Sequence, residues 1–346
     1  MFLGFWKDLS RPIVGLSPMD GVTDAAMRKI TAKYGCPEVI FTEFVSAEGI
    51  KAGAVKLLSE LVYDESERPV VAQLFGNDKE AFYLATLVVC ALGFDGVDVN
   101  MGCPAKSVES RGGGAGLIKK PKLAREMVEE VKKAISDWVD GVSLESVGLS
   151  EEMVGEVMRM RGEKGLKERK RLAVSVKTRV GYESKEETKE WMKTVKGFKV
   201  AAVSLHGRTF KQLYGGEADW QLIGEARKIF EGEETIFLGN GDVGSRDEAE
   251  RVVEKYGVDG VLIGRSARGN PFVFKGDGEV GYRERLKVAV EHVRVFEGIF
   301  GKEYFLPMRK HLAWYVKGFE GASELRSRLV RTDSANEVEK LIKEYL

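Results

Sequence analysis

The chain has 346 residues, and its 54 lysine and arginine residues balance 54 aspartate and glutamate residues, so the formal net charge is zero. This balance excludes a polycationic nucleic-acid coat and an acidic solvating tail, although it allows a local basic patch. Apolar residues make up 43% of the chain, which excludes wholesale disorder. The 3 cysteines do not form a disulfide framework, and they are too few for an all-cysteine zinc or iron–sulfur site.

Targeting and membrane segments are not evident in the sequence. The longest apolar stretch, Ala85–Phe94, is about half as long as a membrane span. The apolar N-terminus is interrupted at Lys7 and Asp8, which makes it too short for a signal peptide. We therefore expect a soluble, cytoplasmic protein of enzyme size that has no membrane partner.

Short β-rich runs recur along the chain, and amphipathic segments stand between them. The runs are Ile13–Leu16, Val39–Thr42, Val70–Leu74, Gly96–Asn100, Ala173–Lys177, Ala202–His206, Ile236–Gly239 and Gly260–Gly264. The helical segments include Asp24–Lys33, Lys79–Leu92, Pro121–Asp137, Lys185–Lys196 and Arg246–Tyr256. Nearly continuous apolar strands alternating with helices indicate parallel pairing, and eight such units over ~250 residues predict an α/β fold of the (β/α)8 TIM barrel type.

A doubly wound sheet is the competing fold. It would normally have fewer strands and a glycine-rich dinucleotide turn after the first one. The first predicted strand is followed by Ser17-Pro18-Met19-Asp20-Gly21, which lacks that turn. This segment favours the barrel.

Two segments exceed a minimal barrel. Residues from about 139 to 171 contain a predicted helix, Ser150–Met160, and a basic run over residues 159–171, which we interpret as a solvated helical elaboration. After the barrel, helical spacing predicts helices over residues 286–300, around Phe305–Phe319, over Ala322–Val330 and from Ser334, with Glu337 completing a capping box. We predict a barrel domain over residues 1–278 and a small all-helical C-terminal domain over residues 279–346.

Polar residues follow every predicted strand, whereas the strand bodies are apolar. They are Ser17, which the apolar Met19 follows closely, Glu43, Gln73, Asn100, Lys177 and Arg179, His206 and Arg208, Asn240 and Asp242, and Arg265. The C-terminal ends of the strands meet at one rim of a (β/α)8 barrel, where active sites are built. We therefore expect these side chains to form one site.

Glycine-rich turns follow the last two strands, at Gly239–Asp242 and Gly264–Pro271. Backbone N–H groups there can approach an anion closely, and this is the usual phosphate site of the barrel. Arg265 adds a cation, and Lys177 suits an electron-rich ring that becomes anionic on reduction, such as a flavin. His206 is placed to donate to the same ring. These residues predict a ligand that carries a phosphate.

A distinctive loop, Asn100–Lys106, follows the fourth strand and is succeeded by the glycine run of residues 110–116. A cysteine in such a loop is placed to transfer a proton, so Cys103 is the candidate catalytic residue. The chain has only 3 histidines and no Cys/His cluster with ligand spacing, so we expect neither thiol-protease chemistry nor a metal site.

With these residues in view, the sequence resembles the tRNA-dihydrouridine synthases, and most closely their bacterial B type. The resemblance is carried by residues 17–24, 73–76, 98–106, 176–181, 206–209, 239–242, 264–265 and 309–318. It implies FMN bound by Pro18, Met19, Asp20, Gln73, Lys177, His206, Asn240, Gly241, Asp242, Gly264 and Arg265. Asp20 stands where the family usually has a small residue.

The resemblance also implies a reaction. NADPH or NADH reduces FMN, hydride passes from the flavin to C6 of a tRNA uridine, and Cys103 protonates C5 to give 5,6-dihydrouridine. Asn100, Lys106, Arg179 and Arg208 would lie near the uracil or the RNA, and Arg309 and Lys310 in the tail would contact tRNA. Neither the tRNA position nor the preferred nicotinamide follows from the sequence, and we expect a monomer.

Two other functions are compatible with parts of this pattern. A small-molecule FMN oxidoreductase of the dihydroorotate dehydrogenase type would share the barrel and the flavin residues, and a flavin-free RNA-binding protein would share the tail. The first needs no helical tail, in which residues 302–331 carry seven basic and three acidic side chains. The second does not need the complete set of flavin residues.

Overall fold

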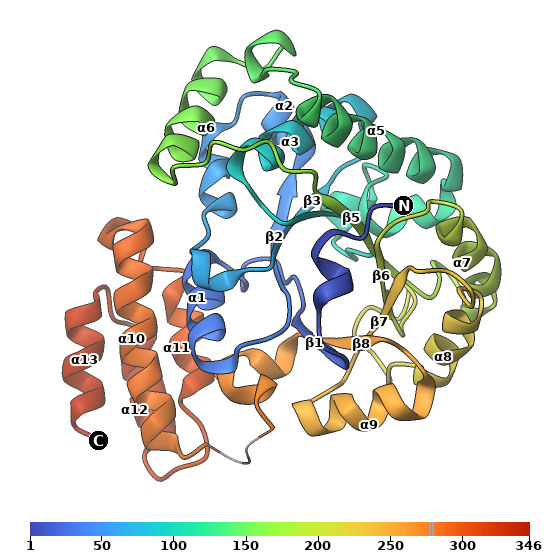
Figure 1. Ribbon diagram of the computed structural model, residues 1–346. Coiled ribbons are helices and arrows are strands. Elements are labelled where there is room, and N and C mark those ends of the chain that lie inside the picture. The colour runs from blue at the N-terminus through green and yellow to red at the C-terminus, as the bar shows by residue number, and fades with distance from the viewer. Residues whose placement is uncertain (277, 279) are drawn as a thin grey trace.

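The computed structural model describes residues 1–276, 278 and 280–346. Eight parallel strands close a barrel in chain order, with β8 paired to β1, and Figure 1 shows the helices arranged around it. The strands are β1 (Ile13–Leu16), β2 (Ile40–Ser46), β3 (Val70–Phe75), β4 (Gly96–Met101), β5 (Ala173–Arg179), β6 (Ala202–His206), β7 (Ile236–Asn240) and β8 (Gly260–Ile263). This architecture confirms the predicted (β/α)8 barrel.

The strands are buried along almost their whole length, as expected for parallel strands covered by helices. Strand bodies are nevertheless not purely apolar, which corrects the prediction. Gln73, Asp98 and Ser175 pair with one another in register across β3, β4 and β5, and all three are fully buried. A polar row therefore crosses the interior of the barrel beneath the strand ends.

Helices follow the strands around the outside of the barrel. They are α1 (Ala25–Gly35), α2 (Ala47–Lys51), α3 (Lys79–Leu92), α4 (Lys106–Glu109), α5 (Pro121–Val139), α7 (Thr188–Lys196), α8 (Trp220–Lys228) and α9 (Arg246–Tyr256). Side-chain caps fix several of their starts: Asp24, Asp78 and Ser245 each accept a hydrogen bond from a backbone N–H in the first turn. In the described part of the chain, no helix is both long and apolar enough to cross a bilayer.

The segment between β4 and β5 contains the predicted additional helix, α6 (Glu151–Glu163), which packs beside α3 (Figure 1). Several basic groups near its end have structural partners. Arg161 donates to the carbonyl of Ala91 at 2.7 Å, and the ammonium of Lys164 lies 3.5 Å from the ring centroid of Tyr63. These two cations therefore hold neighbouring elements together, whereas Lys167, Lys170 and Arg171 of the same run are exposed.

The tail forms α10 (Tyr282–Phe300), α11 (Met308–Tyr315), α12 (Ala322–Leu329) and α13 (Ala335–Lys343). These helices share a hydrophobic cluster that also includes Ala26 and Ile30 of α1, so the tail is docked on the barrel at α1 (Figure 1). The predicted domain boundary between residues 278 and 279 falls beside residue 279, which lies outside the described residues.

Two local predictions for the tail need correction. The helix expected over Phe305–Phe319 spans only Met308–Tyr315, because a separate 3-10 turn forms at Lys302–Tyr304 and the backbone leaves helical geometry at Val316. Ser334 does cap α13 by accepting from the N–H of Glu337. The carboxylate of Glu337, however, accepts from the N–H of Asp333 instead of that of Ser334. The reciprocal half of the capping box is therefore displaced by one residue.

Candidate active site

A cavity of about 820 Å³ opens at the C-terminal ends of the strands, which is within the usual size range of ligand sites. The predicted site residues that line it are Pro18, Met19, Asp20, Gln73, Asn100, Cys103, Lys177, Arg179, His206, Asn240, Gly241, Asp242, Gly264 and Arg265. The set includes every residue predicted to bind the cofactor and the candidate catalytic cysteine. Side chains from all parts of the barrel sequence are thus brought to one place.

Five predicted residues lie outside the cavity lining, and the first of them, Glu43, lies within β2, which continues to Ser46 instead of ending before Glu43. Lys106 is exposed at the start of α4, and Arg208 is buried behind Asp242. Arg309 and Lys310 are on α11, where Arg309 donates to the carbonyl of Thr332 at 2.9 Å and pairs with Asp333. The exposed ammonium of Lys310 lies near Gly21, at the rim of the cavity.

One end of the cavity is a cationic cradle built around Asp242. This carboxylate accepts from Arg208 and from Arg265, both at 2.6 Å, so it holds the two guanidinium groups in place. The adjacent Gly241 has a φ of +132°, and a Cβ there would lie 2.5 Å from the Cβ of Ala218. Only glycine fits this turn, and its bare backbone can approach an anion.

The middle of the cavity presents Lys177 and His206. The ammonium of Lys177 donates to Oδ1 of Asn240 at 3.0 Å, and Asn240 in turn donates to the carbonyl of Leu262 at 2.8 Å. Burial, with a smaller contribution from Arg179, lowers the pKa of Lys177 to about 8. Burial and the neighbouring cations also lower the pKa of His206 strongly, so its ring is neutral. The site therefore offers a cation and a neutral hydrogen-bonding ring.

This donor set fits a flavin mononucleotide. The glycine turn and Arg265 match its phosphate, and Lys177 has a neutral partner instead of a carboxylate, which leaves its charge available to an electron-rich ring. The described residues hold no group of three or more His, Cys, Asp or Glu side chains arranged to bind a metal ion.

Cys103 sits in a loop that is held from two sides. Oδ1 of Asn100 accepts from the N–H groups of Gly102 and Cys103 at 3.0 and 2.9 Å. On the other side, Nε of Arg179 donates to the carbonyl of Gly102 at 2.7 Å. Cys103 is only 7% exposed, and burial raises the pKa of its thiol, so the thiol stays protonated at neutral pH. A protonated thiol that faces the cavity is suited to give a proton.

Some cavity residues were not predicted to belong to the site. Phe44, Tyr214 and Arg268 all line it. Arg268 also lies 5.1 Å from the ring centroid of Trp314 on α11, so it connects the cavity with the tail. Arg268 belongs to the glycine-rich stretch after the last strand, which was a usable signal. Phe44 follows the bulge that lengthens β2, and Tyr214 lies in an irregular loop, so neither position carried a signal.

The fold and the site together define a (β/α)8 enzyme whose chemistry lies at the C-terminal ends of its strands. Comparison with known families identifies it further: the sequence model of the dihydrouridine synthase family matches residues 15–145 and 161–346. The chain therefore belongs to the dihydrouridine synthase family and is a flavin-dependent oxidoreductase. The unmatched internal residues, 146–160, include most of α6, as expected for an insertion.

Curated relatives resemble the chain over nearly its full length. It is 32% identical to a probable tRNA-dihydrouridine synthase 2 of Bacillus subtilis (strain 168), over 99% of this chain and 96% of that protein. It is 34% identical to a probable tRNA-dihydrouridine synthase of Staphylococcus aureus (strain COL), over 99% and 95%. Among solved structures, an old yellow enzyme homologue from Zymomonas mobilis has a TM-score of 0.42 and 14% identity, over 75% of this chain and 86% of that one.

Proposed function

We propose that this enzyme reduces a uridine of tRNA to 5,6-dihydrouridine, with FMN as its flavin, NADPH or NADH as the reductant and Cys103 as the proton donor. The observation that carries the proposal is the protonated Cys103 thiol in a cavity that also contains a cationic cradle and a buried lysine. The naming of the full-length relatives as tRNA-dihydrouridine synthases supports the substrate.

The residues of the cavity divide the task of holding the cofactor. Arg265 and the turn at Gly241 would bind the phosphate, and Asp242 would keep Arg265 oriented. Lys177 would stabilise negative charge on the ring, and neutral His206 would donate a hydrogen bond to it. The chemistry that FMN supplies when bound is hydride transfer to C6 of the uracil.

Cys103 completes the reduction by moving its S–H proton to C5, which balances the hydride added at C6. The thiolate that remains is stabilised by the positive charges of Arg179 and Lys177, both of which act electrostatically on this thiol. The proton is then recovered from solvent. Because Asn100 and Arg179 hold the loop, the proton is delivered from a fixed direction.

The uridine must leave its stack to enter the cavity, which costs a few kcal/mol. Exposed Tyr214 at the rim offers an aromatic face, and Lys310 of the tail lies at the same rim near Gly21. These groups support the assignment of an RNA substrate over a free small molecule. We also propose that the enzyme acts in the cytoplasm and that it is a monomer. Light scattering of the purified protein tests the monomeric state.

The direct test is to map dihydrouridine in tRNA from cells that lack this chain and from cells that re-express it. We expect at least one modified position to disappear and to return with the wild-type chain. If every dihydrouridine persists without the chain, tRNA is not its substrate. Flavin released by acid is expected to be FMN instead of FAD, because the cavity offers one phosphate cradle at β7 and β8.

The proton-donor role is tested with Cys103→Ala. We expect this variant to retain FMN and its reduction by nicotinamide, and to reduce uridine at least ~10²-fold more slowly, because it lacks general-acid catalysis. Cys36→Ala is the matched control, since Cys36 is an exposed cysteine that does not line the cavity. Normal turnover of tRNA by Cys103→Ala would refute the assignment of the thiol.

A further inference from the structure

A chain of buried hydrogen bonds runs from the interior of the barrel to the cysteine loop. Ser175 Oγ and Gln73 Nε2 donate to the carboxylate of Asp98 at 2.6 and 2.7 Å. Asn100 Nδ2 donates to Gln73 Oε1 at 2.8 Å, and the N–H of Cys103 donates to Asn100 Oδ1 at 2.9 Å. Asp98, Gln73, Asn100 and Ser175 are each at most 6% exposed. The contacts therefore form without competition from bulk water.

The groups at the two ends of this hydrogen-bond network determine which atom donates and which accepts in each of its bonds. An ionised carboxylate only accepts, so Gln73 must turn its NH2 group toward Asp98 and its oxygen toward Asn100. At the other end, two backbone N–H groups require the oxygen of Asn100, which leaves its NH2 group for Gln73. The two requirements agree, so a single arrangement of both amides satisfies them.

The buried carboxylate of Asp98 is unfavourable for stability, which indicates that it has another role. A fully buried carboxylate pays a desolvation penalty, and an apolar side chain of similar size would pack without it. Burial raises the pKa of Asp98 to about 6, and hydrogen bonds from Ser175 and Gln73, with the charge of Lys177, oppose that rise. The carboxyl is therefore ionised at neutral pH and acts as an acceptor.

We propose that Asp98 is a positioning residue for the proton donor: by accepting from Gln73, it orients the amides of Gln73 and Asn100 so that Asn100 holds the backbone of Cys103. This proposal rests on the proposed role of Cys103. Without the acceptor at Asp98, the Gln73 amide can reverse, and Asn100 would then turn its own NH2 group toward two N–H donors. The loop would lose its anchor on this side and keep the contacts from Arg179 and from the N–H of Ala115, which donates to the carbonyl of Cys103.

The test compares Asp98→Ala, Asp98→Asn and Ser175→Ala. Asp98→Ala removes the acceptor, and we expect uridine reduction to slow by about tenfold, while the rate of flavin reduction by nicotinamide, measured per bound FMN, is unchanged. Asp98→Asn keeps an oxygen for Gln73 and can donate to the Ser175 hydroxyl, so it should retain most of the rate. Ser175→Ala, the matched control, leaves the contact between Asp98 and Gln73 intact and should react normally.

A second measurement does not depend on turnover. Alkylation of Cys103 by iodoacetamide, followed by peptide mass spectrometry, reports how well the loop covers the thiol. We expect about tenfold faster alkylation in Asp98→Ala and wild-type rates in Asp98→Asn and Ser175→Ala. If Asp98→Ala does not fold, Asp98→Leu fills the same space without an acceptor and gives the same comparison.

The possible results separate the two proposals. Wild-type reduction and alkylation rates in Asp98→Ala would overturn the positioning role. It would also be overturned if Asp98→Asn were as impaired as Asp98→Ala, because the charge instead of the acceptor would then matter. Normal tRNA reduction by Cys103→Ala would instead refute the proton-donor assignment, and the alkylation rates would still decide whether Asp98 positions the loop.

Discussion

At the scale of single residues, the cavity contains a cation, Lys177, whose burial lowers the stability of the folded chain. The pKa of Lys177 falls from 10.5 to about 8 because burial disfavours the charged form. Below a pH of about 8 the folded chain therefore carries a penalty that the unfolded chain does not. Between about pH 8 and 10.5 the folded chain has released this proton and the unfolded chain has not, so stability rises with pH there and the penalty fades.

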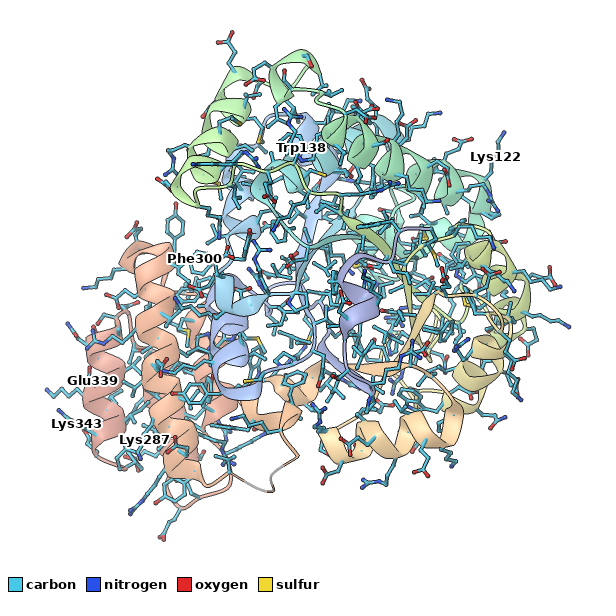
Figure 2. All side chains as sticks on the ribbon, viewed as in Figure 1. Lys122, Trp138, Lys287, Phe300, Glu339 and Lys343 are labelled. Carbon is cyan, nitrogen blue, oxygen red and sulfur yellow. The ribbon has the colours of Figure 1, made fainter. Side chains whose placement is uncertain are left out.

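We therefore predict that Lys177→Met stabilises the flavin-free protein by about 1–3 kcal/mol near pH 7, and that the gain shrinks above about pH 8. Urea unfolding near pH 7 and above about pH 8 measures the gain in unfolding free energy. Flavin fluorescence should show weaker FMN binding by the variant. Lys122→Met, on the outer side of α5 (Figure 2), is the exposed control and should change neither property. Equal unfolding free energies for wild type and Lys177→Met would contradict the prediction.

Most cavity residues could be predicted from the sequence because they stand where an apolar strand ends, and strand ends converge in a barrel. Asp98 and Ser175 were missed as functional residues because they lie within strands, two residues before Asn100 and Lys177. The alternation of side chains places such pairs on the same face, which is a signal that strand-end reasoning does not use. Lys106 shows the opposite error: its place in the predicted loop suggested a site residue, but it is exposed and does not line the cavity.

At the scale of elements, a buried polar cluster joins α1 to the tail helices. His311 Nε2 lies 3.0 Å from a carboxylate oxygen of Asp24, whose other oxygen caps α1. His292 Nδ1 lies 3.1 Å from the hydroxyl of Tyr315. The helices could be predicted from their periodicity, but this cluster could not, because it joins residues whose positions are more than 260 apart in sequence.

The cluster makes tail docking sensitive to acid. Burial lowers the pKa of His292 to about 3. Burial would raise the pKa of Asp24, but His311, His292 and the N–H of Met27 together outweigh this effect and lower it to about 2. The unfolded chain thus binds more protons than the folded chain from about pH 6.5, the ordinary value for histidine, downward. The free energy of unfolding therefore decreases as the pH is lowered through this range, by up to about 1.4 kcal/mol per pH unit for each such group.

We predict that the tail helices lose protection from hydrogen exchange between about pH 6.5 and 4, before the barrel strands do. His292→Gln cannot acquire the charge and should flatten this dependence. Lys287→Gln is the control because Lys287 is an exposed residue of α10, the helix that also carries His292. The same pH profile in wild type and His292→Gln would show that this cluster does not set the acid response.

At the scale of the whole molecule, charge placement distinguishes the two faces of the tail. The net charge of the chain is zero, so general attraction to RNA is absent and local cations must guide binding. Arg309 and Arg328 are already paired with Asp333 and Glu344. Lys310 is exposed and reaches Gly21 at the cavity rim, whereas Lys343 lies on the far edge of the tail (Figure 2). If tRNA spans the tail and the cavity, Lys310 meets phosphate and Lys343 does not.

We predict that Lys310→Ala weakens tRNA binding and reduces the slope of log affinity against log salt by about 0.7–0.9, the value for one lost phosphate contact. Lys343→Ala removes the same charge from the other face and should leave affinity and slope unchanged. Filter binding over about 50–200 mM salt measures both, and FMN content confirms an intact barrel. Equal losses in the two variants would mean that only net charge matters. In that case the RNA would not lie along the rim between α11 and the first strand end.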